Sequence, residues 1–277
     1  MITGCSSGIG YCAAHTLAKR GYRVFATARK DTDVQRLQAE GLEALRLDLD
    51  DSLSIERAVT EILHRTNGTL DALFNNGAYG QPGAVEDLRR DVLRAQFETN
   101  LFGTIELTNR VIPVMRRQGH GRIVQNSSVL GLAALPYRGA YNATKFALEG
   151  ITDTLRLELA GSGIHVSLIE PGPVKSRFRA NAYAAFQRNI DKEHSAHNQI
   201  YEALERRLTK QGPSTSFTLP PDAVVAKLIN ALESPRPRIR YYVTKPTYFF
   251  AALRRILPYR ALDWVMQRVS ADEHKDQ

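Results

Sequence analysis

The chain carries a glycine-rich run close to its first residue, which reads Thr3-Gly4-Cys5-Ser6-Ser7-Gly8-Ile9-Gly10. Glycines at positions 4, 8 and 10 permit a tight turn, close approach of the backbone to a pyrophosphate group, and close packing of a helix on a strand. A helix that begins at such a turn directs free backbone N–H groups and the positive end of its dipole toward the phosphates. Taken alone, the run fits a dinucleotide-binding turn and an ordinary structural turn about equally well.

Strands and helices alternate along most of the chain around this run. Short β-branched and apolar runs predict strands over residues 22–29, 44–49, 70–75, 122–127 and 164–170. Helical stretches lie between them, over residues 11–20, 32–40, 53–66, 90–117 and 140–160. Such alternation indicates βαβ units, and near-continuous apolar strands favour a parallel sheet that is covered on both faces. We therefore expect an α/β fold with a doubly wound parallel sheet.

The composition is that of an ordinary globular protein. Of 277 residues, 43% are apolar and 24% are charged, which excludes a disordered, collagen-like or disulfide-scaffold chain. The sequence has no apolar run of about 18 residues, so we expect no helix that spans a bilayer. Cys5 and Cys12 are too few for a disulfide framework or a zinc site, and we interpret both as packing residues. With no repeat, linker or leader segment, we expect one cytoplasmic domain over residues 1–277 and no metal.

Two regions depart from the alternating pattern. Residues 177–217 form a polar insertion with a long predicted helix, which we expect to lie over a ligand crevice. Residues 235–269 form a basic, amphipathic segment, in which no acidic residue occurs before position 263. Seven cations between residues 235 and 262 supply most of the net charge of +8: Arg236, Arg238, Arg240, Lys245, Arg254, Arg255 and Arg260.

The apolar residues of the basic segment follow two stripes at helical spacing. The stripes are Phe249, Leu253, Ile256 and Leu257, and then Leu262, Val265, Met266 and Val269. They indicate packing on the domain or on a partner subunit in preference to peripheral membrane contact, which stays an alternative. No recognition motif accompanies the basic residues, so we expect no nucleic-acid partner.

The end of the second expected strand indicates which dinucleotide would bind. In folds of this kind an acidic residue there holds the ribose 2′-hydroxyl of NAD, whereas an arginine accommodates the 2′-phosphate of NADP. Here Arg29 and Lys30 follow the strand, and the first acid is Asp31. Arg29 can hold a phosphate through two hydrogen bonds, and Lys30 adds a second positive charge. NADP(H) is therefore the predicted cofactor, with two solvated loop charges as the alternative.

A tyrosine and a lysine at helical spacing supply candidate acid–base chemistry. Tyr141 and Lys145 are four residues apart near the start of a predicted helix, so they share one face. An ammonium group beside a phenol favours the phenolate, which lowers the tyrosine pKa and suits a general acid or base. Ser128 lies 13 residues earlier. It follows a predicted strand, at the edge where open α/β sheets bind ligands.

Together these motifs resemble the short-chain dehydrogenase/reductase family in its single-domain form, over residues 3–176. The resemblance is carried by the glycine-rich run, Asp48, Asn75-Asn76-Gly77, Asn100, Ser128, Tyr141, Lys145 and Pro171-Gly172-Pro173-Val174. The glycine-rich run and Arg29 look most like the 17β-hydroxysteroid and retinol dehydrogenase branch, and like related bacterial NADP-dependent aldehyde reductases. The resemblance implies a Rossmann-like sheet of order 3-2-1-4-5-6-7 and a homo-oligomer, either a dimer or a tetramer.

The resemblance also implies catalytic roles. Tyr141 would exchange a proton with the substrate oxygen, and Ser128 would orient the carbonyl. Lys145 would lower the Tyr141 pKa and bind the nicotinamide ribose, while Asn100 would hold a water that connects Lys145 to solvent. The implied cofactor contacts are Gly4, Ser6, Ser7, Gly8, Ile9, Gly10, Arg29, Lys30, Asp48, Leu49, Asn75, Gly77, Tyr141, Lys145, Pro171, Val174 and Ser176. Structural alternatives remain for Asn100 as a helix cap, Asp48 as a turn residue and Pro171 as a strand end.

Two features depart from the family pattern. The family usually reads Asn-Asn-Ala-Gly where this chain reads Asn75-Asn76-Gly77-Ala78, so we expect backbone strain at Ala78. Only Met1 and Ile2 precede the glycine-rich run, which leaves little of the central first strand. We therefore expect unpaired ladder groups on the neighbouring strands, and a natural start upstream that supplies further apolar residues.

The residues between Ser128 and Tyr141 indicate the substrate. Residues 129–138 are mostly apolar and offer no fixed charge for a carboxylate near the carbonyl. We therefore predict reduction of an apolar aldehyde or ketone, or the reverse reaction, with a steroid or retinoid as a narrower option. An acidic substrate stays open through the nearby cations Arg138, Lys175, Arg177 and Arg179. A non-catalytic NADP-binding sensor is the alternative class, but it would not need the complete set of Asn100, Ser128, Tyr141 and Lys145.

Overall fold

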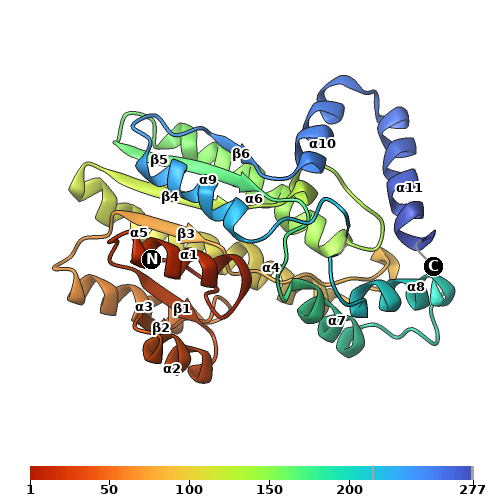
Figure 1. The fold of residues 1–277 in the computed structure, drawn as a ribbon, viewed down its shortest axis with the longest axis horizontal. Helices are drawn as coiled ribbons and strands as arrows, with labels where there is room; N and C mark the ends of the chain where they lie inside the picture. Colours follow the sequence, from red (N-terminus) through yellow and green to blue (C-terminus); the bar gives the residue numbers. More distant parts are fainter. Residues whose placement is uncertain (214, 276–277) are drawn as a thin grey trace.

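The computed structural model describes residues 1–213 and 215–275, with side chains through residue 270. A parallel sheet forms the centre of the molecule (Figure 1). Its strands lie in the order β2 (Glu43–Arg46), β1 (Phe25–Ala28), the residue Ile2, β3 (Ala72–Asn75), β4 (Gly121–Asn126), β5 (Ile164–Glu170) and β6 (Arg240–Tyr242). The expected α/β fold and strand order are confirmed, with Ile2 in the place of the first strand.

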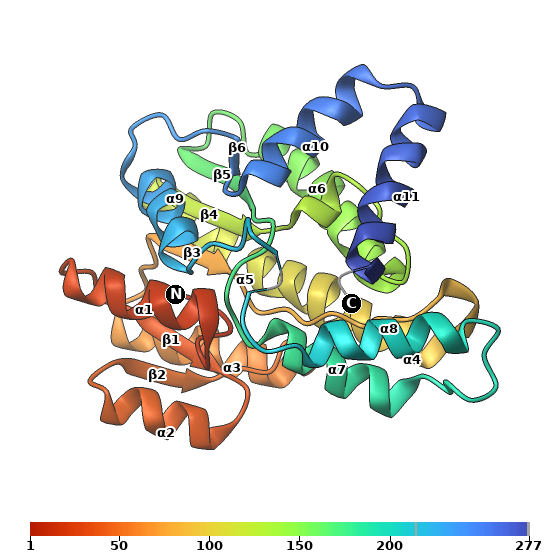
Figure 2. The same ribbon diagram turned by 45° about the vertical axis from the view of Figure 1, so that its right-hand side comes forward.

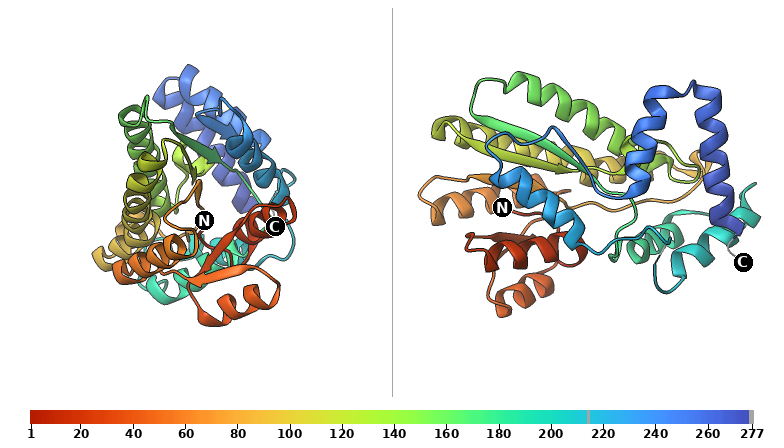
Figure 3. Two further views of the ribbon diagram at one scale, coloured as in Figure 1. Left: turned by 90° about the vertical axis from the view of Figure 1, so that its left-hand side faces the viewer. Right: turned by 45° about the horizontal axis from the view of Figure 1, so that its top comes forward.

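Helices cover both faces of the sheet, and Figure 3 shows the resulting layers. One face carries α1 (Gly8–Lys19) and α9 (Asp222–Glu233), with α2 (Asp31–Ala39) at its edge. The other carries α3 (Ser52–Arg65), α5 (Gly103–Gln118) and α6 (Gly139–Glu158). Successive strand residues point to opposite faces, so Leu73 joins one apolar cluster and Phe74 the other. Both clusters are buried, which explains the continuous apolar strands.

The first residues form the centre of the sheet despite their small number. Ile2 pairs in parallel with Ala26 on one side and with Phe74 on the other. Backbone bonds run from Ile2 N to Phe25 O at 2.9 Å, from Thr3 N to Phe74 O at 3.0 Å, and back from Thr27 N to Ile2 O at 3.0 Å. The expectation of unpaired ladder groups is therefore wrong at these positions. Both neighbouring strands, β1 and β3, are four residues long.

The single helix expected over residues 90–117 is interrupted. The structure has α4 (Arg90–Phe97), a π-helical turn (Glu98–Phe102) and then α5. Gly103 lies at the end of this turn, where an added Cβ would meet the Leu49 carbonyl oxygen at 1.8 Å. The π turn contains Asn100, which agrees with the tendency of such turns to occur at functional sites.

The two irregular regions of the sequence are both mainly helical. The insertion forms α7 (Phe178–Asn189) and α8 (Asn198–Thr209) in place of one long helix, with the non-helical residues 190–197 between them. Short 3-10 turns (Val85–Asp87 and Val129–Gly131) lie in the loops after β3 and β4. The basic segment contains β6, a strand that the sequence did not predict, followed by α10 (Lys245–Ile256) and α11 (Tyr259–Lys275). Figure 2 shows α10 and α11 as a helical hairpin above the insertion.

In the hairpin, the second apolar stripe and part of the first pack on the domain. Leu262, Val265, Met266 and Val269 of α11 pack with Ala133 and Phe250. In the first stripe Leu253 joins the same cluster, but the side chains of Phe249 and Ile256 are 53% and 76% exposed. Among the described residues, no helix has the length and apolar character needed to cross a membrane.

One arginine joins three elements beneath the carboxyl end of the sheet. Arg240 of β6 binds Glu149 and Asp153 of α6, and its Nη1 donates to Glu170 Oε1 of β5 at 2.6 Å. Glu170 is fully buried, and Glu149 nearly so. Burial and the neighbouring Glu149 raise the pKa of Glu170, which favours its protonated, neutral form beside Glu149.

Candidate active site

The sheet and α6 bring Ser128, Tyr141 and Lys145 together. Ser128 lies two residues after β4, where its hydroxyl accepts a hydrogen bond from Leu130 N at 3.1 Å. Tyr141 and Lys145 occupy the first two turns of α6, and the Tyr141 hydroxyl is hydrogen-bonded with Ser128. The Lys145 Nζ lies 5.6 Å from the centre of the Tyr141 ring and donates to Asn126 O at 2.7 Å. The polar groups of Ser128, Tyr141 and Lys145 therefore lie close together beyond the carboxyl end of β4.

Burial dominates the titration of this group. The Tyr141 ring is partly exposed, but burial of its hydroxyl raises the pKa of Tyr141 to about 12, against the opposing effect of the bond with Ser128. Burial also lowers the pKa of Lys145 to about 8, against the opposing charge of Glu149. The expected lowering of the Tyr141 pKa by Lys145 is not found in this structure, because burial outweighs the hydrogen bond with Ser128 and Lys145 contributes no resolved lowering.

Asn100 was expected to hold a water molecule, and in the structure its side chain forms hydrogen bonds with two other parts of the protein. Its Nδ2 donates to Tyr79 O at 2.9 Å and to Thr144 Oγ1 at 3.3 Å, and its Oδ1 accepts from Tyr79 N at 3.1 Å. The side chain thereby ties the loop after β3 to α6, next to Lys145. These protein contacts engage both ends of the amide, so a water would have to bind beside this group without replacing them.

The glycine-rich run forms a tight turn that leads directly into α1. Gly4 and Gly8 have φ values of +70° and +60°, which side-chain-bearing residues rarely adopt. Helix α1 begins at Gly8, its N-cap Ser7 makes no capping bond through its side chain, and no acid occupies the first turn. An added Cβ at Gly8 would lie 2.9 Å from Ser176 Cβ. These residues fit an anion at the helix N-terminus, enclosed by the loop after β5.

A path of hydrogen bonds joins this turn to Lys145. The Asn76 Nδ2 donates to Thr3 O at 3.0 Å, and the Asn126 Nδ2 donates to Asn76 Oδ1 at 2.9 Å. The backbone oxygen of Asn126 then accepts the bond from Lys145. Sequence reasoning did not select Asn76 or Asn126 as site residues. The signal that could have found Asn126 is a polar residue at the end of a largely apolar strand.

Asn75 differs from its expected placement. Its Nδ2 donates to Thr108 Oγ1 at 2.8 Å within the protein interior, so the side chain points away from the glycine-rich turn. Gly77 instead lies directly against that turn, since an added Cβ at Gly4 would be 2.8 Å from Gly77 Cα. The strain expected at Ala78 is absent there, because Ala78 does not have a positive φ.

The residues expected around the adenosine half lie at the ends of β1 and β2. Arg29 and Lys30 are exposed directly after β1, and neither forms an ion pair within the described part of the chain. Arg36 of α2 lies nearby, but it already donates to Ser6 O at 2.7 Å and pairs with Asp33 at 3.2 Å. The Asp48 side chain accepts a hydrogen bond from Asp50 N at 3.2 Å, as the alternative interpretation of Asp48 as a turn residue predicts.

An apolar wall adjoins Tyr141. The Phe178 ring, from the first residue of α7, packs edge-on against Tyr141 at 5.2 Å between ring centres. Val174 pairs with Leu219, which holds the loop after β5 in place. Arg138 and Arg179 are two of the four cations for which the sequence analysis left an acidic substrate as an alternative. Both bind backbone oxygens: Arg138 donates to Pro136 O at 3.0 Å, and Arg179 donates to Arg207 O at 3.4 Å.

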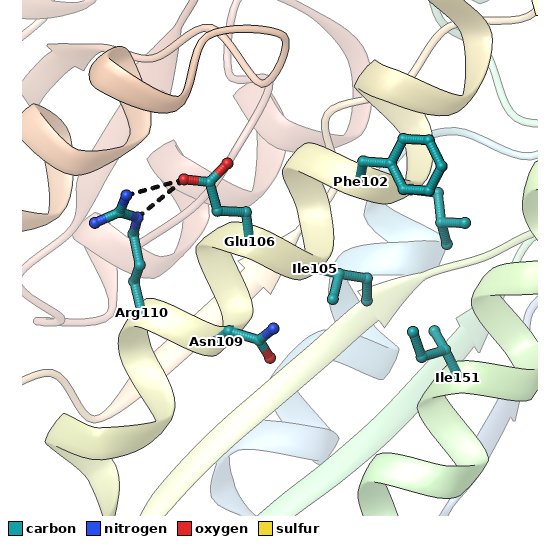
Figure 4. A pocket seen from close by; sticks show the side chains of 7 residues that line it. Phe102, Ile105, Glu106, Asn109, Arg110 and Ile151 are labelled. Atoms are coloured by element: carbon teal, nitrogen blue, oxygen red, sulfur yellow. Dashed lines mark hydrogen bonds and ion pairs between the residues drawn. The ribbon is translucent and has the colours of Figure 1, made fainter. Parts of the chain in front are cut away.

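A shallow hollow of about 480 Å³ lies on the outer side of α5 and α6 (Figure 4). Phe102, Ile105 and Ile151 supply its apolar lining, and the Glu106–Arg110 ion pair, at 3.0 Å, borders it. The hollow lies on the solvent side of these helices, whereas Tyr141 and Lys145 face the sheet edge. It is therefore separate from the candidate active site.

The fold and this site together define a dinucleotide-dependent oxidoreductase of the short-chain dehydrogenase type. The sequence model of that family, described as short chain dehydrogenase, matches residues 1–186. The chain belongs to this family.

Relatives extend the match over nearly the full chain. An uncharacterized oxidoreductase of Escherichia coli strain K12, YbbO, is 41% identical over 96% of this chain and 93% of its own length. Human 17-beta-hydroxysteroid dehydrogenase type 1 is 33% identical over 88% of this chain and 77% of its own, which confirms the resemblance to that branch.

Solved structures share the fold. A short chain dehydrogenase/reductase of Burkholderia phymatum in complex with NAD has a TM-score of 0.76 at 24% identity, covering 96% of this chain and 94% of that one. A short chain dehydrogenase of Burkholderia cenocepacia J2315 in complex with NADP has a TM-score of 0.73 at 20% identity, covering 96% and 95%. Structures of this fold therefore bind either dinucleotide.

Proposed function

We propose that the protein is an NADP(H)-dependent oxidoreductase that reduces an apolar aldehyde or ketone to the alcohol, or catalyses the reverse reaction. The observation that carries the proposal is the meeting of Ser128, Tyr141 and Lys145, joined by hydrogen bonds through Asn126 and Asn76 to the glycine-rich turn. A protein that only binds a dinucleotide has no need of a buried tyrosine and lysine at that place.

Each residue has a defined task in the proposed reaction. Bound NADPH supplies a hydride to the carbonyl carbon. Ser128 holds the carbonyl oxygen by a hydrogen bond, and Tyr141 gives that oxygen its proton, which the elevated pKa of Tyr141 keeps in place at neutral pH. The Lys145 ammonium supports the negative charge left on Tyr141 and binds the nicotinamide ribose. Asn100 positions α6 through Thr144.

Arg29 supports NADP(H) over NAD(H). It is exposed at the end of β1 and unpaired among the described residues, whereas Arg36 already has protein partners. A free guanidinium at this place suits the 2′-phosphate, which a carboxylate would repel.

The surroundings support the remaining assignments. Phe178 and the apolar residues 129–135 favour a substrate without charge, for which a steroid or retinoid is the narrower option. The two free cysteines support a cytoplasmic location, and we treat residues 1–277 as one catalytic domain. Phe102 and Ile151, which are 52% and 40% exposed beside the hollow of Figure 4, support a homo-oligomer with its contact there.

The proposed chemistry is tested by the substitution Tyr141→Phe. It removes the proton donor and keeps the ring, so NADPH should still bind while turnover falls by about 10²–10⁴-fold. The measurement is NADPH oxidation over a panel of aliphatic, aromatic, retinoid and steroid carbonyls, with binding followed by NADPH fluorescence. Wild-type protein that binds NADPH but turns over none of these carbonyls would favour the sensor, and a variant with near wild-type turnover would contradict the role of Tyr141.

Cofactor choice is tested separately by Arg29→Ala. Loss of the phosphate contact should raise the KM for NADPH and leave the use of NADH nearly unchanged. Arg20→Ala is the matched control, because Arg20 pairs with Glu233 at the far end of α1. A wild-type preference for NADH, or an equal effect of both variants, would show that Arg29 does not select the cofactor.

A further inference from the structure

The outer side of α10 combines aromatic, aliphatic and cationic side chains in solvent. Tyr248, Phe249 and Ile256 are 51%, 53% and 76% exposed. At 100° per residue they share one side of the helix with the exposed Lys245 and Arg255. The opposite side packs on the domain through Thr247, Phe250 and Ala251, which are buried. Tyr248 packs edge-on against Tyr242 and Phe249 against Phe250, yet both side chains stay about half exposed, and Ile256 lies mostly in solvent.

The same surface continues beyond the end of α10. Tyr259, at the start of α11, is 87% exposed. Of the fourteen large apolar side chains that are exposed among the described residues, five lie within residues 248–264. Such a concentration marks an interaction surface, since scattered exposed apolar residues are ordinary but clustered ones are not. We call the set Lys245, Tyr248, Phe249, Arg255, Ile256 and Tyr259 the docking face.

Charge indicates which partner fits this face. It carries two cations, and the sequence from 235 to 262 contains no acid. A second copy bound symmetrically through the same face would bring like charges together, because a two-fold contact pairs a surface with itself. An anionic surface with an apolar interior would instead match both the cations and the aromatic groups.

We propose that the docking face binds the surface of a membrane that contains anionic phospholipid. Phe249 and Ile256 would enter the boundary between headgroups and acyl chains, with Tyr248 and Tyr259 at the level of the headgroups. Lys245 and Arg255 would contact the phosphates. The sequence favoured packing of both apolar stripes on the domain or on a partner subunit, and within this chain only the α11 stripe and the inner side of α10 pack on the domain.

The docking face lies directly behind the loop that follows Ser128. From the other side of α10, Arg254 donates to Leu132 O at 2.9 Å and its guanidinium lies 4.8 Å from the centre of the Phe146 ring. Phe250 and Leu253 pack against Ala133 and Leu135. Figure 1 shows the hairpin at the end of the molecule away from α1 and α2. Membrane binding would thus bring the substrate loop next to lipid and leave the cofactor end in water. This consequence, unlike the binding itself, rests on the proposed function.

The test is flotation of the full chain with phosphatidylcholine vesicles that contain or lack phosphatidylglycerol, at low and high salt. We expect binding only to the anionic vesicles, weakened by salt. Arg255→Glu combined with Ile256→Ser should lower the bound fraction at least about tenfold. The matched control, Arg117→Glu with Leu157→Ser, makes the same charge reversal and an equivalent aliphatic-to-serine change on α5 and α6, and it should bind as the wild type does.

Several outcomes would overturn the proposal. The first three are no flotation with anionic vesicles, equal flotation with both kinds of vesicle, and an equal loss of vesicle binding in both double variants. The fourth is a change in the mass of the α10 variant measured by light scattering, which would identify a second copy of the chain as the occupant. Near-UV circular dichroism and NADPH fluorescence establish that each variant is folded. Flotation does not depend on turnover, so its result stands apart from that of Tyr141→Phe.

Discussion

Burial shifts the two ionisable groups at the centre of the site in opposite directions. The pKa of Tyr141 rises to about 12 and that of Lys145 falls to about 8, since both shifts favour the neutral form. Tyr141 therefore keeps its proton throughout the neutral range, and Lys145 is the group that changes charge closest to it.

This difference predicts the pH dependence of cofactor capture. The ammonium of Lys145 is lost as the pH rises through about 8, so kcat/KM for NADPH should fall above that pH. In Lys145→Arg the guanidinium stays charged, and any residual activity should lack this descending limb. Initial rates from pH 6 to 10 supply the measurement. A wild-type limb that begins only near pH 10 would show that burial does not lower the Lys145 pKa.

Ser128, Tyr141 and Lys145 could be predicted from the sequence, because their residue types and their spacing indicate acid–base chemistry without any knowledge of the structure. Asn75 was predicted on the cofactor side, where the structure has Asn76. Adjacent residues at a strand end point to opposite faces, so an uncertainty of one residue in register exchanges the two. Asn126 was missed because its importance comes from the path between Thr3 and Lys145, which connects residues far apart in the sequence.

At the scale of elements, the periodicity of apolar residues predicted most helices and strands, but it did not predict the π turn or the shortest strand. The helix over residues 90–117 was expected to be continuous because its apolar spacing runs through the π turn. β6 is three residues long, too short to produce an alternating pattern. The close approach of the glycine-rich turn to Ser176 depends on a loop that is more than 160 residues away.

That approach predicts a specific defect in Gly8→Ala. Both Gly8 and Gly21 have positive φ, at +60° and +87°, so alanine at either position costs about 1–2 kcal/mol of backbone strain. Only at Gly8 would the new methyl group also meet Ser176, at 2.9 Å, whereas nothing lies within 4 Å at Gly21. We expect similar losses of stability in urea but weaker NADPH binding in Gly8→Ala alone. Equal NADPH dissociation constants for the two variants would contradict this role of the turn.

Across the whole molecule, the order of the sheet followed from the family resemblance, and the strand alternation explained its two covered faces. The pairing of Met1, Ile2 and Thr3 with both β1 and β3 could not be predicted, because two or three residues are too few to show a strand pattern. The packing of α11 against the loop after Ser128 was equally hidden, since it joins residues more than 120 positions apart.

The assembly of subunits supplies a test at this scale. If the hollow between α5 and α6 is covered by a second copy, Phe102→Asp with Ile151→Asp would bury carboxylates in that contact and lower the mass measured by light scattering. Leu53→Asp, at a residue that is 60% exposed on α3, is the control and should not change the mass. Unchanged mass in the double variant would exclude this contact.

The arginine that joins β5, β6 and α6 has a consequence for how the sequence can vary. Replacing Arg240 alone leaves Glu149 and Glu170 facing each other in the interior, a change that typically costs about 3–5 kcal/mol. Replacing all three with apolar residues of similar volume removes the conflict and is commonly neutral or stabilising. Substitutions at these positions are therefore strongly non-additive. A single replacement in this cluster is therefore expected to destabilise the fold, whereas a combined replacement of the three side chains is expected to be tolerated.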